Sequence, residues 1–449
     1  MKELDQNRLA ALEASFGQRE ANRIAMNAVT INGIDKVARD YDKARRLQRR
    51  FSVTVDNGEV TNQERSGRCW LFSSLNVARF LAKKALNVKK FEFSQNYAMY
   101  WDKLERANYF LEDIAALAVS GEAVDSRLVQ HLLADLMGDG GQWTMALNVY
   151  AKHGVVPKDL YPETASSRNT GQLNVQLRHV LRQGAARLFE AHASGTSAAD
   201  VDAIKADALA AAHRVLTIHL GEPPASFDWE WTDRDGAFHR DGEITPVEFW
   251  QRYVISQENL EDYVCLVDDP RREHPKGEKI AIEHLGNVAG GKPTEYLNVD
   301  AAFMKDCVRR ILTDKGIPVW FGADCHPMMD RESGAWATDL FDYGRVYDVD
   351  FALDKEERVR FADSAMNHAM AFVGVDVADN GTSTRRWRVE NSWGDKIADK
   401  GYFTMDDPWF DQYVYEVAVP RDMLPDEYRA ALERPAIALP AWDPMGALA

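Results

Sequence analysis

The chain has 449 residues, of which 45% are hydrophobic and 28% charged, and its 70 acidic side chains against 54 basic ones give a net charge of −16. This length allows about three domains of ordinary size or one elaborated domain with a large core. A surface this acidic repels nucleic acid and anionic membranes, so we expect neither as a partner.

Cysteine usage and the N-terminus indicate a cytoplasmic protein. The first residues, Met1 to Asp5, contain no apolar signal core, and no run approaches the roughly 18 apolar residues that cross a bilayer. Adjacent residues such as Asp324, Cys325 and His326 rarely chelate one ion together, so we expect no metal and no cofactor. The four cysteines form no CxxC pair and are expected as reduced thiols: Cys69, Cys265, Cys307 and Cys325.

The first 50 residues are charged and favour helices, with an amphipathic piece near Leu9 to Phe16. The basic patch from Lys43 to Arg50 is typical of a solvated helix face, and a pore-lining or assembly role is the alternative. Phe51 to Val55 alternates and predicts a strand.

The segment from Asn62 to Phe72, NQERSGRCWLF, places Cys69 at the start of a predicted helix. The helix dipole and unpaired N–H groups at such a terminus lower a thiol pKa, which favours a thiolate nucleophile. Gln63 carries an amide donor that a turn could bring to an oxyanion beside the sulfur. A buried structural cysteine is the alternative. The helix itself is predicted by apolar residues at spacings of three and four: Leu71, Leu75, Ala78 and Ala82.

A second predicted helix, Phe91 to Ala116, carries an aromatic stripe that we expect in the core. Between it and a third helix, Thr144 to Lys152, lie Gly140 and Gly141. Two adjacent glycines allow another backbone to approach closely, so they are candidates for binding an extended chain. A plain loop is the alternative.

The middle of the chain reads as helical from Gln172 to Leu220, with a loop from Ala193 to Ser197. Alternating aromatic residues around Asp235-Gly236 then predict a small hairpin. Further along, Ala302 to Asp314 predicts a helix, and Gly316 to Ala323 predicts an apolar strand in a sheet behind the hairpin that follows.

His368 and Asn391 flank a second predicted hairpin, whose turn is the polar run from Asp379 to Thr384. Folding the chain about this turn makes His368 and Asn391 neighbours. A carboxamide that bonds one imidazole nitrogen fixes the tautomer and aims the other nitrogen at a nucleophile. Trp393 could cover the pair and exclude water. An isolated core histidine is the alternative.

The C-terminal residues predict an arm. Leu424 to Arg434 reads as a helix stopped by Pro435, and the 15 residues that follow contain one charged side chain, Asp443. An exposed apolar tail is a liability, so we expect it to dock on the body of the protein. Docking on the outside or simple fraying is the alternative.

The order Gln63, Cys69, His368, Asn391, with Gly67 to Trp70 and Asn391 to Gly394, resembles papain-like cysteine peptidases. The Cys and His lie about 300 residues apart, whereas about 130–150 separate them in that family. This extra length and the ending PAWDPMGALA, Pro440 to Ala449, are similar to the bleomycin hydrolase and bacterial aminopeptidase C family. The similarity also covers five internal segments: Phe93 to Tyr97, Trp101 to Arg106, Asp139 to Trp143, Val319 to Gly322 and Trp409 to Glu416.

The resemblance implies an α+β, papain-like fold with large helical and hook-like insertions. It divides the chain into a helical half with Cys69 (1–164), an inserted oligomerisation region (165–300), a β half with His368 and Asn391 (301–434) and an arm that enters the cleft (435–449). It implies a homohexamer and substrate contacts from Gly140, Gly141, Trp393 and the carboxylate of Ala449.

The function implied is that of an intracellular cysteine aminopeptidase with broad specificity. Cys69 attacks the peptide through an acyl thioester, with His368, Asn391 and Gln63 completing the catalytic set, and hydrolysis of bleomycin-like amides is possible. One alternative is a papain-like endopeptidase whose tail lies elsewhere. The other is a non-catalytic ring scaffold, against which the presence of all four catalytic residue types argues.

Overall fold

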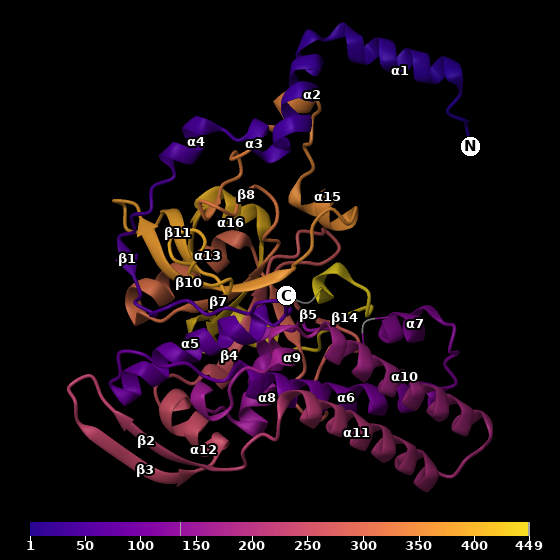
Figure 1. The fold of residues 1–449 in the computed structure, drawn as a ribbon, viewed down its shortest axis with the longest axis vertical. Coiled ribbons are helices and arrows are strands. Elements are labelled where there is room, and N and C mark those ends of the chain that lie inside the picture. Colours follow the sequence, from indigo (N-terminus) through magenta and orange to yellow (C-terminus); the bar gives the residue numbers. More distant parts are fainter. Residues whose placement is uncertain (135, 448–449) are drawn as a thin grey trace.

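The computed structural model describes residues 1–134 and 136–447, and Figure 1 shows its arrangement. Helices dominate the first half of the chain, and strands dominate the second half. The elements up to residue 250 are α1 (Gln6–Gln18), α2 (Glu20–Asn32), α3 (Ile34–Ala38), α4 (Tyr41–Arg46), β1 (Val53–Thr54), α5 (Cys69–Leu86), α6 (Gln95–Ser120), α7 (Arg127–Ala134), α8 (Trp143–His153), α9 (Ala165–Arg168), α10 (Gly171–Ala193), α11 (Ala198–Leu220), β2 (Phe227–Thr232), β3 (Phe238–Ile244) and α12 (Pro246–Trp250).

The second half follows with β4 (Tyr263–Val267), β5 (Lys279–Ile282), β6 (Glu295–Asn298), α13 (Ala301–Arg310), β7 (Val319–Ala323), β8 (Met329–Asp330), β9 (Ala335–Trp336), α14 (Tyr343–Tyr347), α15 (Lys355–Arg360), β10 (His368–Val377), β11 (Thr384–Glu390), β12 (Tyr402–Asp406), α16 (Asp407–Tyr413), β13 (Val414–Pro420), α17 (Asp426–Leu432) and β14 (Ile437–Leu439). Within the described residues, no helix combines the length and apolar character that crossing a membrane requires.

The main sheet runs in the order β14-β5-β6-β4-β13-β7-β10-β11-β12-β9-β8, and β1 pairs with β10. The strands at its centre, β13, β7 and most of β10, are buried along their length. The predicted strand from Gly316 to Ala323 is confirmed as β7. It lies beside β10 in the same sheet, with His368 opposite Ala323, and not behind the hairpin as predicted.

The predicted hairpin around residues 379–384 is confirmed as β10 and β11, which pair antiparallel with Ala371 opposite Glu390. Its turn forms because the Asn380 carboxamide oxygen accepts hydrogen bonds from the backbone N–H groups of Thr382 and Ser383, at 3.1 and 2.9 Å. This register carries the chain after Glu390 to the beginning of β10, where His368 lies.

Helix α5 begins at Cys69, as predicted, and is buried on nearly every side. It packs against β10, and it ends at Asn87, whose left-handed conformation terminates the helix. In the aromatic stripe of α6, Tyr97, Tyr100 and Phe110 are buried, which confirms the prediction for them, whereas Trp101 and Tyr109 are only partly buried.

The inserted helices α10 and α11 pack side by side on α6, and the β2–β3 hairpin extends from another part of the body (Figure 1). The predicted break from Ala193 to Ser197 is confirmed, since α10 ends and α11 begins there. Strands β4, β5 and β6 join the main sheet, so residues 165–300 contribute to the core as well as to the insertion. The division into four segments stays a prediction.

The N-terminal helices stand apart from this core. Helices α1 and α2 contain no buried residue, and α1 projects away from the body (Figure 1). The basic patch is partly engaged, because Lys43 of α4 forms ion pairs with Asp339 and Asp406, at 2.5 and 3.1 Å.

Candidate active site

The thiol of Cys69 lies at the N-terminus of α5 and against the first residues of β10. The thiol lies 4.0 Å from the Gly67 carbonyl, to which it can donate, and the backbone N–H groups of Ala369, Trp70 and Cys69 itself act on the sulfur. Ala369 directly follows His368, so the fold brings the sulfur to the residue next to the imidazole. Positions about 300 residues apart in sequence thereby meet in one site.

Burial raises the pKa of Cys69 to about 11, although the three backbone N–H groups act to lower it. The prediction of a lowered thiol pKa is therefore wrong in its net direction. The helix terminus acts on the sulfur as expected, but Cys69 is only 2% exposed, and removing a thiolate from water outweighs that effect.

His368 and Asn391 are joined by a hydrogen bond of 2.8 Å between Nε2 and Oδ1. Oδ1 also accepts the backbone N–H of Ser392 at 2.7 Å, which identifies this atom as the carboxamide oxygen. An oxygen that only accepts requires a proton on Nε2, so Nδ1 is left as the basic nitrogen of the neutral ring. Burial lowers the pKa of His368 to about 4, and the hydrogen bond to Asn391 acts in the opposite direction.

The indole of Trp393 covers the imidazole, with ring centroids 4.9 Å apart and planes 24° from parallel. The guanidinium of Arg331 also lies over the indole, 4.7 Å from its centroid. The imidazole is thus held by one hydrogen bond and one stacked ring.

Gln63 is fixed to the same strand end as Asn391. Its backbone N–H donates to the Ser392 carbonyl at 2.8 Å, and its side-chain oxygen accepts from the Ser392 hydroxyl. Its Nε2 donates to the Ser66 carbonyl at 2.6 Å. A carboxamide nitrogen has two hydrogens, so the second can serve a substrate oxygen.

Gly141 packs against the ring of Trp70, where an added Cβ would lie only 2.5 Å from Cε2. Close packing on Trp70 therefore explains why residue 141 is a glycine, and no contact with a substrate is needed to explain it. The neighbouring Gly140 places its carbonyl on Arg106, which donates to it at 3.0 Å. Whether the pair contacts a peptide backbone stays a prediction.

Asp139 is a residue of this region that the sequence did not single out. Its carboxylate accepts from the backbone N–H of Gly67 at 3.1 Å, so it connects the loop before Cys69 to the glycine segment. Burial acts to raise the pKa of Asp139, but Lys103, Thr170 and Asn174 hold it well below its usual range. Only the buried partners reveal this role, and they come from distant segments.

The C-terminal arm docks on the body as predicted, so fraying is excluded for residues 435–447. Strand β14 pairs parallel with β5, and Asp443 forms a buried ion pair with Arg271. Gln142 Nε2 then donates to the Ala447 carbonyl at 3.0 Å, which brings the arm to the residue after Gly141. Ala449 lies outside the described residues, so its predicted substrate contact stays a prediction.

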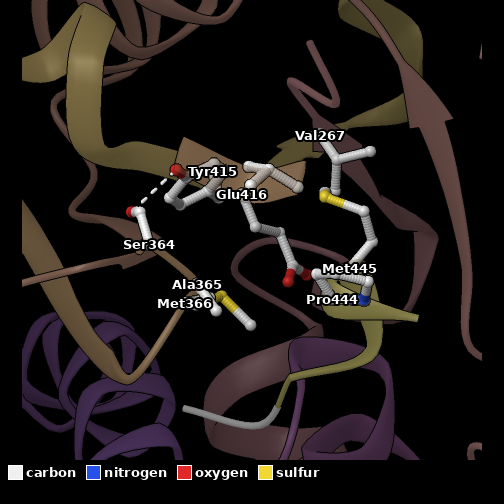
Figure 2. A pocket seen from close by; sticks show the side chains of 9 residues that line it. Val267, Ser364, Ala365, Met366, Tyr415, Glu416, Pro444 and Met445 are labelled. Atoms are coloured by element: carbon white, nitrogen blue, oxygen red, sulfur yellow. Dashed lines mark hydrogen bonds between the residues drawn. The ribbon is translucent and has the colours of Figure 1, made fainter. Parts of the chain in front are cut away.

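Figure 2 shows a small cavity between this arm and the main sheet. Pro444 and Met445 of the arm close one side, and Met366, two residues before His368, lies on another. The volume of about 10 Å³ admits about one water molecule. Glu416 of β13 faces this space, and its Oε1 has no hydrogen-bond partner among the described residues.

No group of three or more metal-ligating side chains occurs within residues 1–134 and 136–447. At the Asp324-Cys325-His326 run the carboxylate accepts from Ser364 and Asn367, while the imidazole is exposed. His326 Nδ1 also lies 3.9 Å from Asp324 Oδ1.

A buried thiol beside a histidine that an asparagine orients defines a papain-like cysteine peptidase site. The chain matches the peptidase C1-like family over residues 3–446 and belongs to that family. Aminopeptidase C from Lactobacillus delbrueckii subsp. lactis is 40% identical over 452 residues, which cover 100% of this chain and 99% of the relative. Bleomycin hydrolase from Homo sapiens is 40% identical over 451 residues, covering 99% of each.

The solved structure of PepW from Lactobacillus rhamnosis is similar in fold, with a TM-score of 0.95, 39% identity and coverage of 100% of this chain and 99% of that one. The predicted papain-like α+β fold is thereby confirmed. The chain is a cysteine-type aminopeptidase of the peptidase C1 family.

We expect iodoacetamide to alkylate Cys69 faster than the other three thiols, by about a hundredfold or more if His368 acts as its base. Burial raises the pKa of all four thiols, so the expected difference depends on His368 acting as the base for Cys69. Alkylation of Cys69 should abolish turnover. Peptide mapping by mass spectrometry over time measures the four rates. His368→Ala should lower the alkylation rate of Cys69 toward the rates of the other thiols. Equal labelling of all four thiols in the wild type would contradict the assignment of Cys69 as the nucleophile.

Glu416→Gln should remove a pH dependence of stability. Burial raises the pKa of Glu416 to about 8 from an ordinary value of 4.5, so the folded state keeps a proton that the unfolded chain loses between those values. The free energy of unfolding of the wild type therefore falls as pH rises through this window. The free energy of unfolding of Glu416→Gln, taken relative to that of wild type, should therefore rise by about 3 kcal/mol between pH 5 and pH 8.

Urea unfolding of both proteins at the two pH values measures this difference. Glu433→Gln is the matched control, because the Glu433 side chain is 69% exposed. Parallel pH profiles for wild type and Glu416→Gln would show that Glu416 ionises normally in the folded protein.

Proposed function

We propose that this enzyme removes N-terminal residues from peptides by covalent catalysis at Cys69, with His368 as acid and base, Asn391 as its orienting residue and Gln63 as an oxyanion donor. The observation that carries the proposal is the His368–Asn391 hydrogen bond. The backbone N–H of Ala369, the residue after His368, acts on the Cys69 sulfur. The His368–Asn391 hydrogen bond leaves Nδ1 of His368 as the basic nitrogen, and we propose that this nitrogen faces the thiol.

Acylation begins from neutral groups. The thiol proton passes to Nδ1 of His368 as the sulfur attacks the carbonyl carbon of the first peptide bond. The oxyanion accepts hydrogen bonds from Gln63 Nε2 and the backbone N–H of Cys69. His368 then gives its proton to the amine nitrogen, the C–N bond breaks, and a thioester remains on Cys69.

Deacylation uses the same base. His368 removes a proton from water, the resulting oxygen nucleophile attacks the thioester carbon, and the C–S bond breaks. The amino acid leaves with the new C–O bond, and the proton returns to the sulfur. Trp393, stacked on the imidazole, supports this cycle by keeping bulk water from one face of the ring.

The arm supports an aminopeptidase over an endopeptidase. The Ala447 carbonyl bonds Gln142, beside Gly140 and Gly141, which we propose as contacts for the substrate backbone. The two residues beyond it would bring the Ala449 carboxylate to the ammonium group of a bound peptide. An anchor on the amine predicts broad residue preference.

The relatives named bleomycin hydrolase support a wider substrate class, so we include amides of that type among the proposed substrates. We also propose a cytoplasmic location, which the free state of Cys69, Cys265, Cys307 and Cys325 supports. A non-catalytic scaffold would not require the hydrogen-bonded His368–Asn391 pair.

Deleting Ala447 to Ala449 should weaken cleavage of peptides with a free amino group and admit N-acetylated peptides, because the charge partner and steric block are lost. Fluorogenic substrates with free and acetylated N-termini measure both activities, and Cys69→Ala should abolish both. A control with glycine at all three positions keeps the length and the terminal carboxylate and should retain wild-type preference. Unchanged preference after deletion would contradict the gatekeeper role while leaving the thiol chemistry intact.

We also propose assembly into a homohexamer. Helices α1 and α2 expose apolar side chains that the body does not cover: Leu12, Phe16, Ile24, Met26 and Ile31. Leu4, just before α1, is exposed as well. Such a surface is typical of an interface between protein chains. The β2–β3 hairpin, which exposes Phe238, is a second candidate contact.

Sedimentation equilibrium should give about six times the chain mass of 50.7 kDa for the full protein. Removing residues 1–32 should lower the assembled mass because it removes the apolar helices. A full-length protein that sediments as a single chain at assay concentration would contradict the hexamer.

A further inference from the structure

We propose that Arg271 determines exopeptidase specificity, because its ion pair with Asp443 seats the C-terminal arm (residues 435–447) and so closes the cleft to internal peptide bonds. This inference rests on the function proposed above. It assigns a specificity role to a residue that belongs neither to the catalytic set nor to the arm.

Arg271 and Asp443 form a bidentate ion pair. Arg271 Nη1 donates to Asp443 Oδ2 at 2.9 Å, and Nη2 donates to Oδ1 at 2.7 Å, so both oxygens of the carboxylate are bound. The two side chains are only 9% and 7% exposed. Paired charge-assisted hydrogen bonds away from water fix both distance and orientation.

Residues in the body of the protein hold the Arg271 side chain in the orientation that this contact requires. Asp269 accepts from its Nε at 2.9 Å and from Nη2 at 2.8 Å, and His274 bonds the same carboxylate through Nδ1. Although burial opposes the charge, Asp269 and Asp443 together raise the pKa of the guanidinium. The cation stays oriented by Asp269, and the arm supplies the second carboxylate.

The pair also shapes the end of the arm. Asp443 Oδ1 accepts the backbone N–H of Met445 at 2.9 Å and so starts the short turn from Pro444 to Gly446. This turn places Met445 in the cavity beside Glu416, as Figure 2 shows, and leads to the Ala447–Gln142 hydrogen bond. Misplacing Asp443 would therefore move the part of the arm that reaches the cleft.

The other attachments of the arm are weaker. Strand β14 pairs over only three residues, and Ile437 and Ala438 in it are exposed. Trp442 lies under the guanidinium of Arg127 at 4.0 Å but is 36% exposed. Asp443 is the single charged side chain after Arg434, so losing its buried partner is strongly unfavourable for the seated arm. Solvation of Asp443 in a released arm would relieve that cost.

The test compares Asp443→Asn and Arg271→Gln with wild type, using kcat/KM for an N-acetylated peptide divided by kcat/KM for its free-amino form. Both variants should raise this ratio by about tenfold or more, because the arm leaves the cleft. KM for the free-amino peptide should rise more than kcat falls, since the reacting residues stay in place. Limited proteolysis should cut the arm faster in both variants.

The matched control is Arg434→Gln, which breaks the exposed ion pair with Glu278 at the residue just before the arm and should leave the ratio unchanged. Asp443→Asn replaces one carboxylate oxygen by an amide group and lies in the arm, outside the body of the protein, so it keeps the test valid if Arg271→Gln fails to fold. If deleting Ala447 to Ala449 changes the ratio but neither charge variant does, the role of Arg271 is overturned and the proposed function stands. If the deletion also has no effect, the gatekeeper role of the arm is overturned together with the role of Arg271, and the thiol chemistry at Cys69 stands.

Discussion

A buried ion pair between Arg79 and Glu390 joins the helix that begins at Cys69 to the strand that ends beside Asn391. Arg79 Nη2 lies 2.6 Å from Glu390 Oε1, and the two side chains are 4% and 0% exposed. Arg79 Nη1 also donates to the Glu59 carbonyl at 2.9 Å, in the segment that leads to Gln63. Breaking a buried pair by removing one partner costs about 3–5 kcal/mol, so these elements are held in a fixed relation.

This fixed relation determines the chemistry of the site. The helix terminus, the His368–Asn391 pair and the Trp393 ring meet in a volume with little water, where charge separation is costly. Burial therefore favours the neutral thiol and the neutral imidazole, as the directions of their pKa values show. Proton transfer to Nδ1 is coupled to attack on the substrate, whose developing oxyanion receives the hydrogen bonds that the resting site prepares.

Local patterns in the sequence predicted the parts of the site that depend on local structure. The start of α5 at Cys69 and the hairpin that places Asn391 beside His368 follow from periodicity and turn residues. Contacts between distant segments gave no such signal. The Arg271–Asp443 pair, the Ser392 bridge to Gln63 and the packing of Gly141 on Trp70 depend on which surfaces meet. The thiol pKa was misjudged for the same reason, since the burial of Cys69 is a tertiary property.

The proposed chemistry requires that Cys69 carries the acyl group during turnover. The decisive experiment is rapid acid quenching of the enzyme with an aminoacyl ester of slow deacylation, followed by intact mass measurement and peptide mapping. We expect one added aminoacyl group, located on the peptide that contains Cys69 and absent in Cys69→Ala. Turnover without any covalent adduct, or an adduct on Cys265, Cys307 or Cys325, would contradict it.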